Sequence, residues 1–463
     1  MRSVGNILLV SCYELGHQPF HLASLYAMLQ QAGYLPMPVD TSVETLSDEA
    51  IVRARFVGIS VPMHTALRLG QQVAERVRQL NPGAHICFYG LYALLNADYL
   101  LQSTIDSAIG GEYEEPLLKL IAAIERGSTE TVPGVSTRAV SSKAWIQRTA
   151  FTVPERRHLP SLDRYARLEM NGSIQLAGYT ESTRGCKHTC QHCPITPVYG
   201  GRFFAVPAEI VMADIRAQVL QGAQHITFGD PDFFNGPGHA MRISRALHRE
   251  FPSITFDATI KIEHLLKQRH LLPELKDLGC AFIVSAVESM NDNVLHHLDK
   301  GHTSADIVAA FDLMEEVGIS LRPSLMPFSP WETLESYIQL LDFFEEHKLI
   351  EHIDPIHFSI RLLIPPGSAL LQATDSQSWL EELEPRAYTY RWRHPDWRMD
   401  ALHQQVAALV EQAANEQIDS IDTFFHIKAL ALAAQGRSMD TGKAVEDYGT
   451  RKVLPHLTES WFC

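Results

Sequence analysis

Three of the seven cysteines in this 463-residue chain, Cys186, Cys190 and Cys193, stand within eight residues of one another. Their spacing, C-x3-C-x2-C, puts three thiolate ligands on one short loop, where they can share a single metal centre. A closed structural zinc site or a fully ligated iron–sulfur cubane takes four protein ligands. The motif therefore predicts a metal centre with one open coordination position.

Two plainer sites stay open on spacing alone. A zinc knuckle would need a fourth ligand, which His188 or His192 could supply. An electron-transfer cluster would use the same thiolates without binding a substrate. The spacing itself favours the open centre over both.

Apolar strands and helices alternate six times from residue 173 to residue 370, and the cysteines follow the first of these strands. This alternation predicts parallel βα units, and six units make a partial barrel whose site lies at the carboxyl ends of the strands. The predicted strands are Ile174–Thr180, His225–Gly229, Ile254–Ile260, Ala281–Val287, Ile319–Met326 and Ile356–Leu363.

A second alternating run fills residues 1–127 and predicts a doubly wound, Rossmann-like parallel sheet. No G-x-G-x-x-G follows its first strand, which argues against a nicotinamide dinucleotide site. Glycines at the strand ends let a bulky ligand approach the backbone. The candidate ligand-contacting residues at these ends are Ser60, Gly90, Gly110, Gly111 and Glu112.

The remaining segments have weaker patterns. Residues 128–172 lose the periodicity and are interpreted as a linker, solvated in the plainer interpretation and an ordered connector in the other. Residues 371–463 are predicted to form a mostly helical C-terminal extension. Tyr390, Trp392 and Trp397 are expected to pack onto the barrel.

Composition limits the function classes. A formal charge of −15 argues against a nucleic-acid-tracking surface. No run approaches 18 apolar residues, so no membrane span is predicted, and the N-terminus lacks the layout of a signal peptide. An odd number of cysteines with three clustered favours a reducing cytoplasm over a secreted disulfide framework.

The cysteine loop after the first of six βα units resembles the radical S-adenosylmethionine (SAM) superfamily. The resemblance implies that Cys186, Cys190 and Cys193 hold three irons of a [4Fe–4S] cluster, while SAM chelates the fourth. One electron passed from the cluster then cleaves a carbon–sulfur bond of SAM. An electron donor such as flavodoxin or ferredoxin is implied as well.

Acidic residues at later strand ends match further motifs of that superfamily. Asp230 and Asp232, in Phe-Gly-Asp-Pro-Asp-Phe-Phe, resemble an acidic, aromatic motif near the SAM methionyl group. Glu288, in Ser-Ala-Val-Glu-Ser, resembles G-x-E-S, whose glutamate lies by the SAM ribose. The resemblance implies that all three bind SAM and that Asp230 and Glu288 are catalytic.

Two further segments near the predicted mouth are less specific. Pro330-Trp331-Glu332-Thr333 resembles P-G-E-T with tryptophan in place of glycine. Arg322 is a candidate for binding the SAM carboxylate, because an inward cation is costly unless it is paired with an anion. Pairing with an internal Asp or Glu is the alternative.

The strand ends of residues 1–127 resemble, in order, the cobalamin-binding domain that precedes many radical SAM enzymes. This implies that Ser60, Gly90, Gly110, Gly111 and Glu112 contact cobalamin. The D-x-H-x-x-G motif of cobalamin proteins with a histidine cobalt ligand is absent, and bound cobalamin is left open.

The whole chain resembles bacterial radical SAM proteins whose tail reads Cys, then selenocysteine or Cys, then Ala-Glu-Pro. The match ends at Cys463, which implies a following UGA codon read as selenocysteine; an ordinary C-terminus is the alternative.

These resemblances imply an enzyme, a transferase that alkylates a small molecule by methyl or aminocarboxypropyl transfer. The alternatives are a non-catalytic iron–sulfur or zinc module and a methylthiotransferase-like RNA modification.

Overall fold

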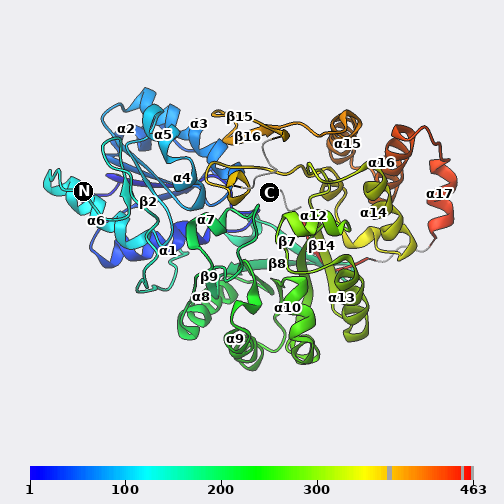
Figure 1. The fold of residues 1–463 in the computed structure, drawn as a ribbon. Helices are drawn as coiled ribbons and strands as arrows, with labels where there is room; N and C mark the ends of the chain where they lie inside the picture. The colour runs from blue at the N-terminus through cyan, green and yellow to red at the C-terminus, as the bar shows by residue number, and fades with distance from the viewer. Residues whose placement is uncertain (373–377, 450–452, 460–463) are drawn as a thin grey trace.

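The computed structural model describes residues 1–372, 378–449 and 453–459. Figure 1 shows the N-terminal sheet and its helices on the left, a second sheet with its helices along the lower side, and the last helices on the right. Among the described residues, no helix is both long enough and apolar enough to cross a bilayer. Cys463 lies outside the described residues, so the tail hypothesis is not addressed by the structure.

The N-terminal sheet has the strand order β2-β1-β3-β4-β5-β6, with all pairs parallel except β5 and β6. Alternate residues of β1 pack into different apolar clusters on the two faces: Leu8 and Val10 in one, Ile7 and Leu9 in the other. Burial on both faces explains why the parallel strands read as uninterrupted apolar runs. The doubly wound prediction is confirmed. Its strands are β1 (Ile7–Ser11), β2 (Met37–Asp40), β3 (Phe56–Ser60), β4 (His85–Tyr89), β5 (Ser107–Ile109) and β6 (Val135–Ser136).

Helices cover both faces of this sheet (Figure 1). They are α1 (Phe20–Gln31), α2 (Asp48–Arg53), α3 (His64–Leu80), α4 (Leu91–Leu95), α5 (Ala97–Ser103) and α6 (Glu114–Arg126). Helix α6 ends at Gly127, which takes the left-handed conformation and closes the helix as a C-cap.

The second sheet has the order β14-β13-β12-β11-β8-β7-β17, with five parallel strands and two antiparallel strands at one edge. This curled, open arrangement confirms an α/β fold with a partial barrel. Its strands are β7 (Arg167–Met170), β8 (Ser173–Thr180), β11 (His225–Phe228), β12 (Thr255–Thr259), β13 (Cys280–Glu288), β14 (Ser320–Leu325) and β17 (His456–Leu457).

The barrel helices begin and end where their capping residues require. Thr303 and Asp306 form a capping box at the start of α13, and the left-handed Gly318 ends it. The helices of this part are α8 (Ala208–Leu220), α9 (Pro237–Glu250), α10 (Ile262–Lys267), α11 (Leu272–Asp277), α12 (Asp292–His297), α13 (Ser304–Val317) and α14 (Leu334–Glu346).

The sixth predicted strand, Ile356–Leu363, is not a strand. Pro355 opens a 3₁₀ helix, Pro355–Ser359, and only Arg361 forms an isolated parallel bridge with Phe328. Proline supplies no backbone donor and fixes φ, which favours the turn over a ladder. The hydroxyl of Tyr337 donates to the carbonyl of Phe358 instead.

The segment 128–172 is an ordered connector, so the solvated interpretation is wrong. Its β6 extends the N-terminal sheet, and its β7 pairs with β8 of the barrel sheet. Arg156 is fully buried and forms an ion pair with Asp214, with Nε 2.6 Å from Oδ1. A buried charge of this kind must be paired, so the connector is fixed between the two sheets.

The C-terminal extension is only partly helical. A hairpin of β15 (Leu380–Glu384) and β16 (Thr389–Trp392) precedes α15 (Trp397–Glu416), α16 (Ser420–Ala434) and α17 (Thr441–Tyr448). The period-2 pattern of Tyr388, Tyr390 and Trp392 is the strand signal there. Tyr390 and Trp392 join an apolar cluster with barrel residues, but Trp397 is 75% exposed because it begins α15 on the solvent side.

Candidate active site

The three cysteines lie on the loop that follows β9 (Thr183–Gly185), a short strand paired with β10 (Phe203–Ala205), and precedes α7 (Ile195–Tyr199). Cys186 and Cys190 are buried, and Cys193 is half-buried. Burial, with a smaller contribution from neighbouring thiols, raises the pKa of the Cys186 thiol to about 11 and that of Cys193 to about 12. A metal ion would deprotonate them, since only the thiolate is a ligand.

Asp230, at the end of β11, holds the start of the cysteine loop. Its carboxylate accepts hydrogen bonds from the backbone N–H of Ser182 at 2.9 Å, the Ser182 hydroxyl at 2.7 Å and the Thr183 hydroxyl at 2.5 Å. Burial raises the pKa of Asp230 to about 6, although these hydrogen bonds oppose the rise. Protein donors therefore occupy this carboxylate, which fixes the approach of β9 to the cysteines.

Asp232 holds the loop at a second point. Its Oδ2 lies 3.2 Å from Nε2 of His188, which stands between two of the cysteines, and 2.6 Å from Nδ1 of His264. Burial favours a raised pKa for Asp232, but the two histidines outweigh it and lower the pKa. These three side chains also have the composition and proximity of a metal-binding group. Lys261 Nζ lies 3.3 Å from Nδ1 of His188 and 3.8 Å from the sulfur of Cys190.

Glu288, at the end of β13, lies against the other end of the loop. Its Oε1 is 3.0 Å from Lys300 Nζ and 3.3 Å from Nε2 of His192. Burial favours a raised pKa for Glu288, but Lys300 and then His192 outweigh it, so the pKa lies far below its usual range. Glu288 also has a left-handed φ of 66°, a strained conformation for a residue with a side chain.

Two histidines of the cysteine loop, His188 and His192, are the candidates for a fourth zinc ligand. Both direct Nε2 to carboxylates, those of Asp232 and Glu288.

The Pro330–Thr333 turn is tied to the Glu288 turn, because the Ser289 hydroxyl donates to Glu332 Oε2 at 2.6 Å. The sequence indicates that the two turns belong together only through the order of the two motifs along the chain, which resembles their order in the superfamily.

Arg322 is not brought to the cysteine loop. It lines a separate cavity of about 330 Å³ with Asp419 and His456, and its NH2 lies 3.4 Å from Asp354 Oδ2. Arg361 similarly pairs with Asp400, at 2.7 Å. Both cations thus have internal acids as partners, which for Arg322 is the alternative interpretation of the sequence.

The predicted cobalamin-contacting residues of the N-terminal sheet are mostly covered by protein. A Cβ on Gly110 would lie 2.5 Å from the Cβ of Leu94, and one on Gly111 would lie 2.6 Å from the carbonyl oxygen of Trp145. These two glycines are therefore needed for packing. Gly90 and Gly111 do line a cavity, and Ser60 is buried at the end of β3.

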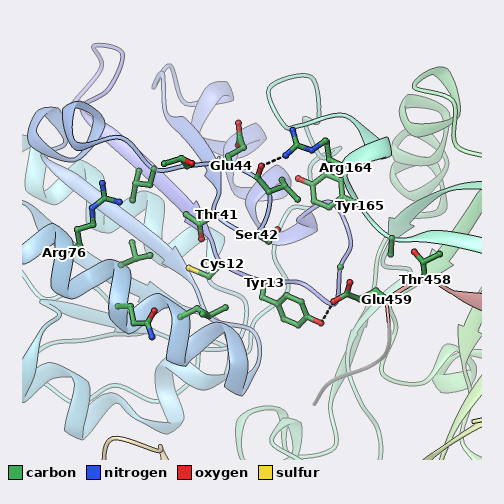
Figure 2. Close-up of a pocket in the computed structure, with 18 residues that line it drawn as sticks. Cys12, Tyr13, Thr41, Ser42, Glu44, Arg76, Arg164, Tyr165, Thr458 and Glu459 are labelled. Atoms are coloured by element: carbon green, nitrogen blue, oxygen red, sulfur yellow. Dashed lines mark hydrogen bonds between the residues drawn. The ribbon is translucent and has the colours of Figure 1, made fainter. Parts of the chain in front are cut away.

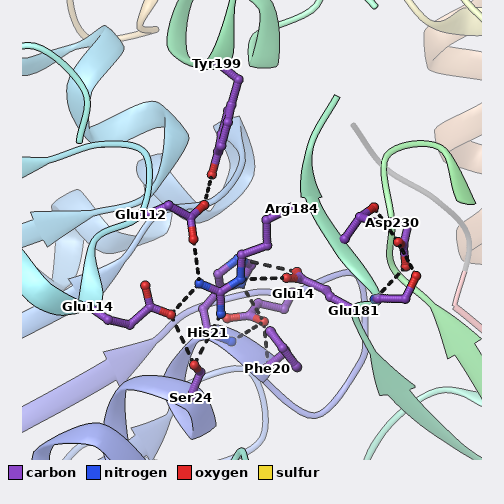
Figure 3. A network of polar contacts seen from close by, with 12 residues as sticks. Glu14, Phe20, His21, Ser24, Glu112, Glu114, Glu181, Arg184, Tyr199 and Asp230 are labelled. Atoms are coloured by element: carbon purple, nitrogen blue, oxygen red, sulfur yellow. Dashed lines mark hydrogen bonds and ion pairs between the residues drawn. The ribbon is translucent and has the colours of Figure 1, made fainter. Parts of the chain in front are cut away.

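Glu112 belongs to a buried ionic network that joins the two sheets (Figure 3). Arg184, two residues before the first clustered cysteine, donates to Glu112 Oε2 at 3.3 Å and to Glu114 Oε1 at 2.5 Å. Its Nε lies 3.4 Å from Glu181 Oε2, and the Tyr199 hydroxyl donates to Glu112 Oε1 at 2.8 Å. Sequence reasoning did not select Arg184, although it stands just before the cysteine motif.

His21 of α1 completes the network from the N-terminal side. Its Nδ1 lies 3.2 Å from Glu14 Oε2, and its Nε2 lies 3.6 Å from Glu181 Oε1. Burial alone would lower the pKa of His21, but Glu14 and Glu181 raise it to about 9. Burial raises the pKa of Glu181 to about 7, against the opposing charges of His21 and Arg184.

Two cavities lie at the carboxyl edge of the N-terminal sheet. The larger, of about 800 Å³, is lined by the residues that follow β1 and β2, by α3, by Arg164–Ala166 and by Thr458–Glu459 (Figure 2). The smaller, of about 170 Å³, lies between the sheet and the cysteine loop. The larger has the size of cofactor cavities and follows the strands next to the point where the strand order reverses, where doubly wound sheets bind cofactors.

Residues 180–344 match the family model described as the radical SAM superfamily. Among curated proteins, the hopanoid C-3 methylase of Methylococcus capsulatus is 25% identical over 234 residues, which cover 50% of this chain and 44% of that protein. The ribosomal-protein methylthiotransferase RimO of Geobacter sulfurreducens is 28% identical over 188 residues, which cover 38% and 41%. The chain thus spans less than half the length of these two relatives.

Several solved structures match over 96% of this chain, among them structures of two proteins. One is the cobalamin-dependent SAM radical enzyme OxsB with aqua-cobalamin bound, with a TM-score of 0.71, 14% identity and 74% of that chain covered. The other is the radical SAM methyltransferase TsrM of Kitasatospora setae with tryptophan and a SAM analogue, with a TM-score of 0.68, 15% identity and 98% covered. At these identities the likeness shows the fold, including both sheets in one arrangement.

Proposed function

We propose that this chain, whose residues 180–344 form a radical SAM domain, is an enzyme that cleaves SAM and transfers a methyl group to a small molecule. The observation that carries the proposal is the trio of cysteines at the barrel mouth, tied to the strand ends at Asp230, Asp232 and Glu288. The methylase and methyltransferase relatives favour methyl transfer over other alkylations.

The residues present fit a [4Fe–4S] cluster with one open iron. Cys186, Cys190 and Cys193 would hold three irons, which leaves one for SAM. Lys261, 3.8 Å from the Cys190 sulfur, offsets the negative charge of such a centre. When bound, the cluster would supply the electron that cleaves a carbon–sulfur bond of SAM.

The chain's own residues would bind and orient SAM. Glu288 is ionised at neutral pH, because Lys300 holds its pKa down, and a charged acceptor makes the stronger hydrogen bonds to ribose hydroxyls. Asp230 and Asp232 give their carboxylates to the cysteine loop in this conformation, so we assign them the positioning of that loop. The buried setting keeps water away from the reacting centre.

Cobalamin is proposed as the methyl carrier, held by the N-terminal domain. The 800 Å³ cavity at the carboxyl ends of β1 and β2 fits a cofactor in size and position. It offers Tyr13, Thr41 and Ser42 as polar contacts but no histidine, in line with the missing D-x-H-x-x-G motif. His64 directs Nε2 to the Ala387 carbonyl at 2.7 Å. Bound cobalamin would supply a transferable methyl group without a histidine ligand.

A second candidate is aminocarboxypropyl transfer without cobalamin, and one observation favours it. The cavity between the cysteine loop and Gly90 measures only about 170 Å³, and the Arg184 network borders it. A corrin does not fit there in this conformation, because drug-sized ligands already need about 300 Å³ or more. Methylthiotransferase-like modification is less favoured, since two RimO proteins match over 38% and 50% of the chain, whereas the structure of the methyltransferase TsrM matches over 96% of it.

The test is anaerobic purification, cluster reconstitution and incubation with SAM and dithionite, followed by product analysis. Methylated product with cobalamin absorbance supports the first candidate, and 5′-deoxyadenosine marks the usual SAM cleavage. Methylthioadenosine without cobalamin supports aminocarboxypropyl transfer. No SAM product from an intact cluster would leave an iron–sulfur binding module and defeat both candidates.

The proposed reaction also requires an electron donor, for which flavodoxin or ferredoxin is the proposal, and a reducing cytoplasm in which the thiols persist. Replacing dithionite by reduced flavodoxin in the same assay tests the donor, and SAM cleavage should continue.

A further inference from the structure

The 170 Å³ cavity between the two sheets is lined from both sides by polar side chains. His21 and Tyr113 come from the N-terminal domain, and Glu181, Arg184 and Tyr199 come from the barrel segment around the cysteines. Gly185 and Ile195 of the cysteine loop also line it. A ligand held there would lie directly against the proposed cluster-binding loop.

The network around this cavity contains more carboxylates than cations. Arg184 and His21 face four carboxylates. All four of these acids are buried: Glu14, Glu112, Glu114 and Glu181. An unpaired buried carboxylate costs several kcal/mol, so the excess requires either bound protons or a further cation.

Several oxygens of the network also lack hydrogen-bond donors. Glu181 Oε2 and the Tyr113 hydroxyl are buried and accept no hydrogen bond from the part of the chain that the structure describes, and both residues line the cavity. Among the described residues, Glu14 Oε1 and Glu114 Oε2 of the same network are also buried without a hydrogen bond. Arg184 Nε pairs with Glu181 by charge at 3.4 Å but without hydrogen-bond geometry. The cavity thus presents acceptors and negative charge together.

We propose that this interdomain cavity binds the ammonium group of a cationic small-molecule substrate, with Glu181 as its counter-ion. The proposal rests on the proposed function, because it takes the ligand to be the substrate. A cavity of about 150 Å³ holds one benzene molecule, so this one holds a fragment of similar size and excludes a larger group. An anionic group would add to the excess negative charge, and a neutral donor would leave it uncompensated.

The protonation of Glu181 gives the proposal a second readout. Burial raises the pKa of Glu181 to about 7, with Asp230 and Glu14 raising it and His21 and Arg184 lowering it. An ammonium ion that pairs with Glu181 displaces its proton near pH 7. The heat of binding should then depend on the ionisation enthalpy of the buffer.

The experiment is calorimetric titration of the cluster-reconstituted full chain with propylammonium, 1-propanol and propionate, three probes of similar size and different charge. We expect saturable one-to-one binding of propylammonium only, with proton release near pH 7. In Glu181→Gln the affinity should fall at least tenfold and the proton release should disappear. Glu115→Gln, on the exposed side of α6, should bind as the parent does.

Three results would overturn the proposal: equal binding of propionate, an equal response to potassium chloride, or unchanged affinity in Glu181→Gln. If that variant does not fold, Glu112→Gln replaces it, and its affinity for propylammonium should also fall. SAM cleavage is assayed on the same samples. Cleavage without ammonium binding defeats only this inference, whereas ammonium binding without cleavage defeats only the proposed function.

Discussion

The carboxyl edges of the two parallel sheets carry different kinds of candidate residue. At the barrel edge, three acidic residues hold the cysteine loop. Asp230 accepts a hydrogen bond from Ser182, just before the cysteine motif. Asp232 and Glu288 contact His188 and His192, which stand between the cysteines. At the N-terminal edge, a Cβ added to Gly110 or Gly111 would meet protein atoms, although Gly111 also lines the 170 Å³ cavity. A charged side chain at a strand end thus indicated a site, whereas a glycine indicated only a close approach of some kind.

The largest expected effect is at the barrel edge. Cys190→Ala removes one of the three proposed cluster ligands, and SAM cleavage should fall below detection together with the iron content. His188→Ala, which removes the link to Asp232, should cost less, roughly 10–100-fold in activity, as supporting residues of metal sites do. Iron content and 5′-deoxyadenosine release measure both.

The matched control is Cys87→Ala in β4 of the other sheet, which should keep its iron and its activity. Equal iron loss in all three variants would mean that the cysteines act through folding, and would remove the contrast between the two edges.

The next effect concerns the contact between the edges. Arg184→Met leaves three buried carboxylates without their main cation, and the free energy of unfolding should fall by about 3–5 kcal/mol. Arg164→Met, a surface change, should stay within about 0.5 kcal/mol. Denaturant unfolding measures both, and adding Glu114→Gln should recover part of the loss. No loss in Arg184→Met would show that the network does not hold the domains together.

Much of the fold could be predicted because burial on both faces produces apolar runs that are visible in sequence. Strands β8, β11 and β12 begin and end within one residue of the predicted bounds. The sixth strand failed because apolar composition does not distinguish a strand from a buried 3₁₀ turn, and the decisive residue was Pro355. The hairpin at residues 380–392 was missed because its alternation is short.

The site was partly predictable for a related reason. All three clustered cysteines lie in one loop, so their spacing is visible directly in the sequence. Two partners of Arg184, Glu114 and Glu112, lie 70 and 72 residues away in the chain, and no local sequence pattern predicts these contacts. Arg322 was placed on a strand correctly, but which acid would neutralise it depends on the fold.

A smaller effect tests the ionic contact by pH. Glu14 and Glu181 raise the pKa of His21 from its ordinary 6.5 to about 9, with Arg184 opposing them. The folded state therefore binds this proton more tightly, so the stability it contributes is complete below about pH 6.5 and is lost as pH rises through about 9. The upper limit is about 3 kcal/mol. In His21→Gln, the melting temperature should fall less steeply between pH 7.5 and 9 than in the parent chain. An unchanged slope would mean that other titratable groups cause the fall.

The smallest effect decides why glycine stands at the N-terminal edge. If Gly110 serves packing, Gly110→Ala forces its Cβ against Leu94 and should cost about 1–3 kcal/mol with or without added cobalamin. Gly83→Ala is the matched control, because its Cβ would meet only Asn81 Oδ1 at 3.9 Å and stability should not fall. If Gly110 instead serves ligand approach, the variant should keep its melting temperature and lose only the stabilisation that cobalamin gives the parent chain. That second result would make the two edges alike, since both would then carry residues whose first role is binding.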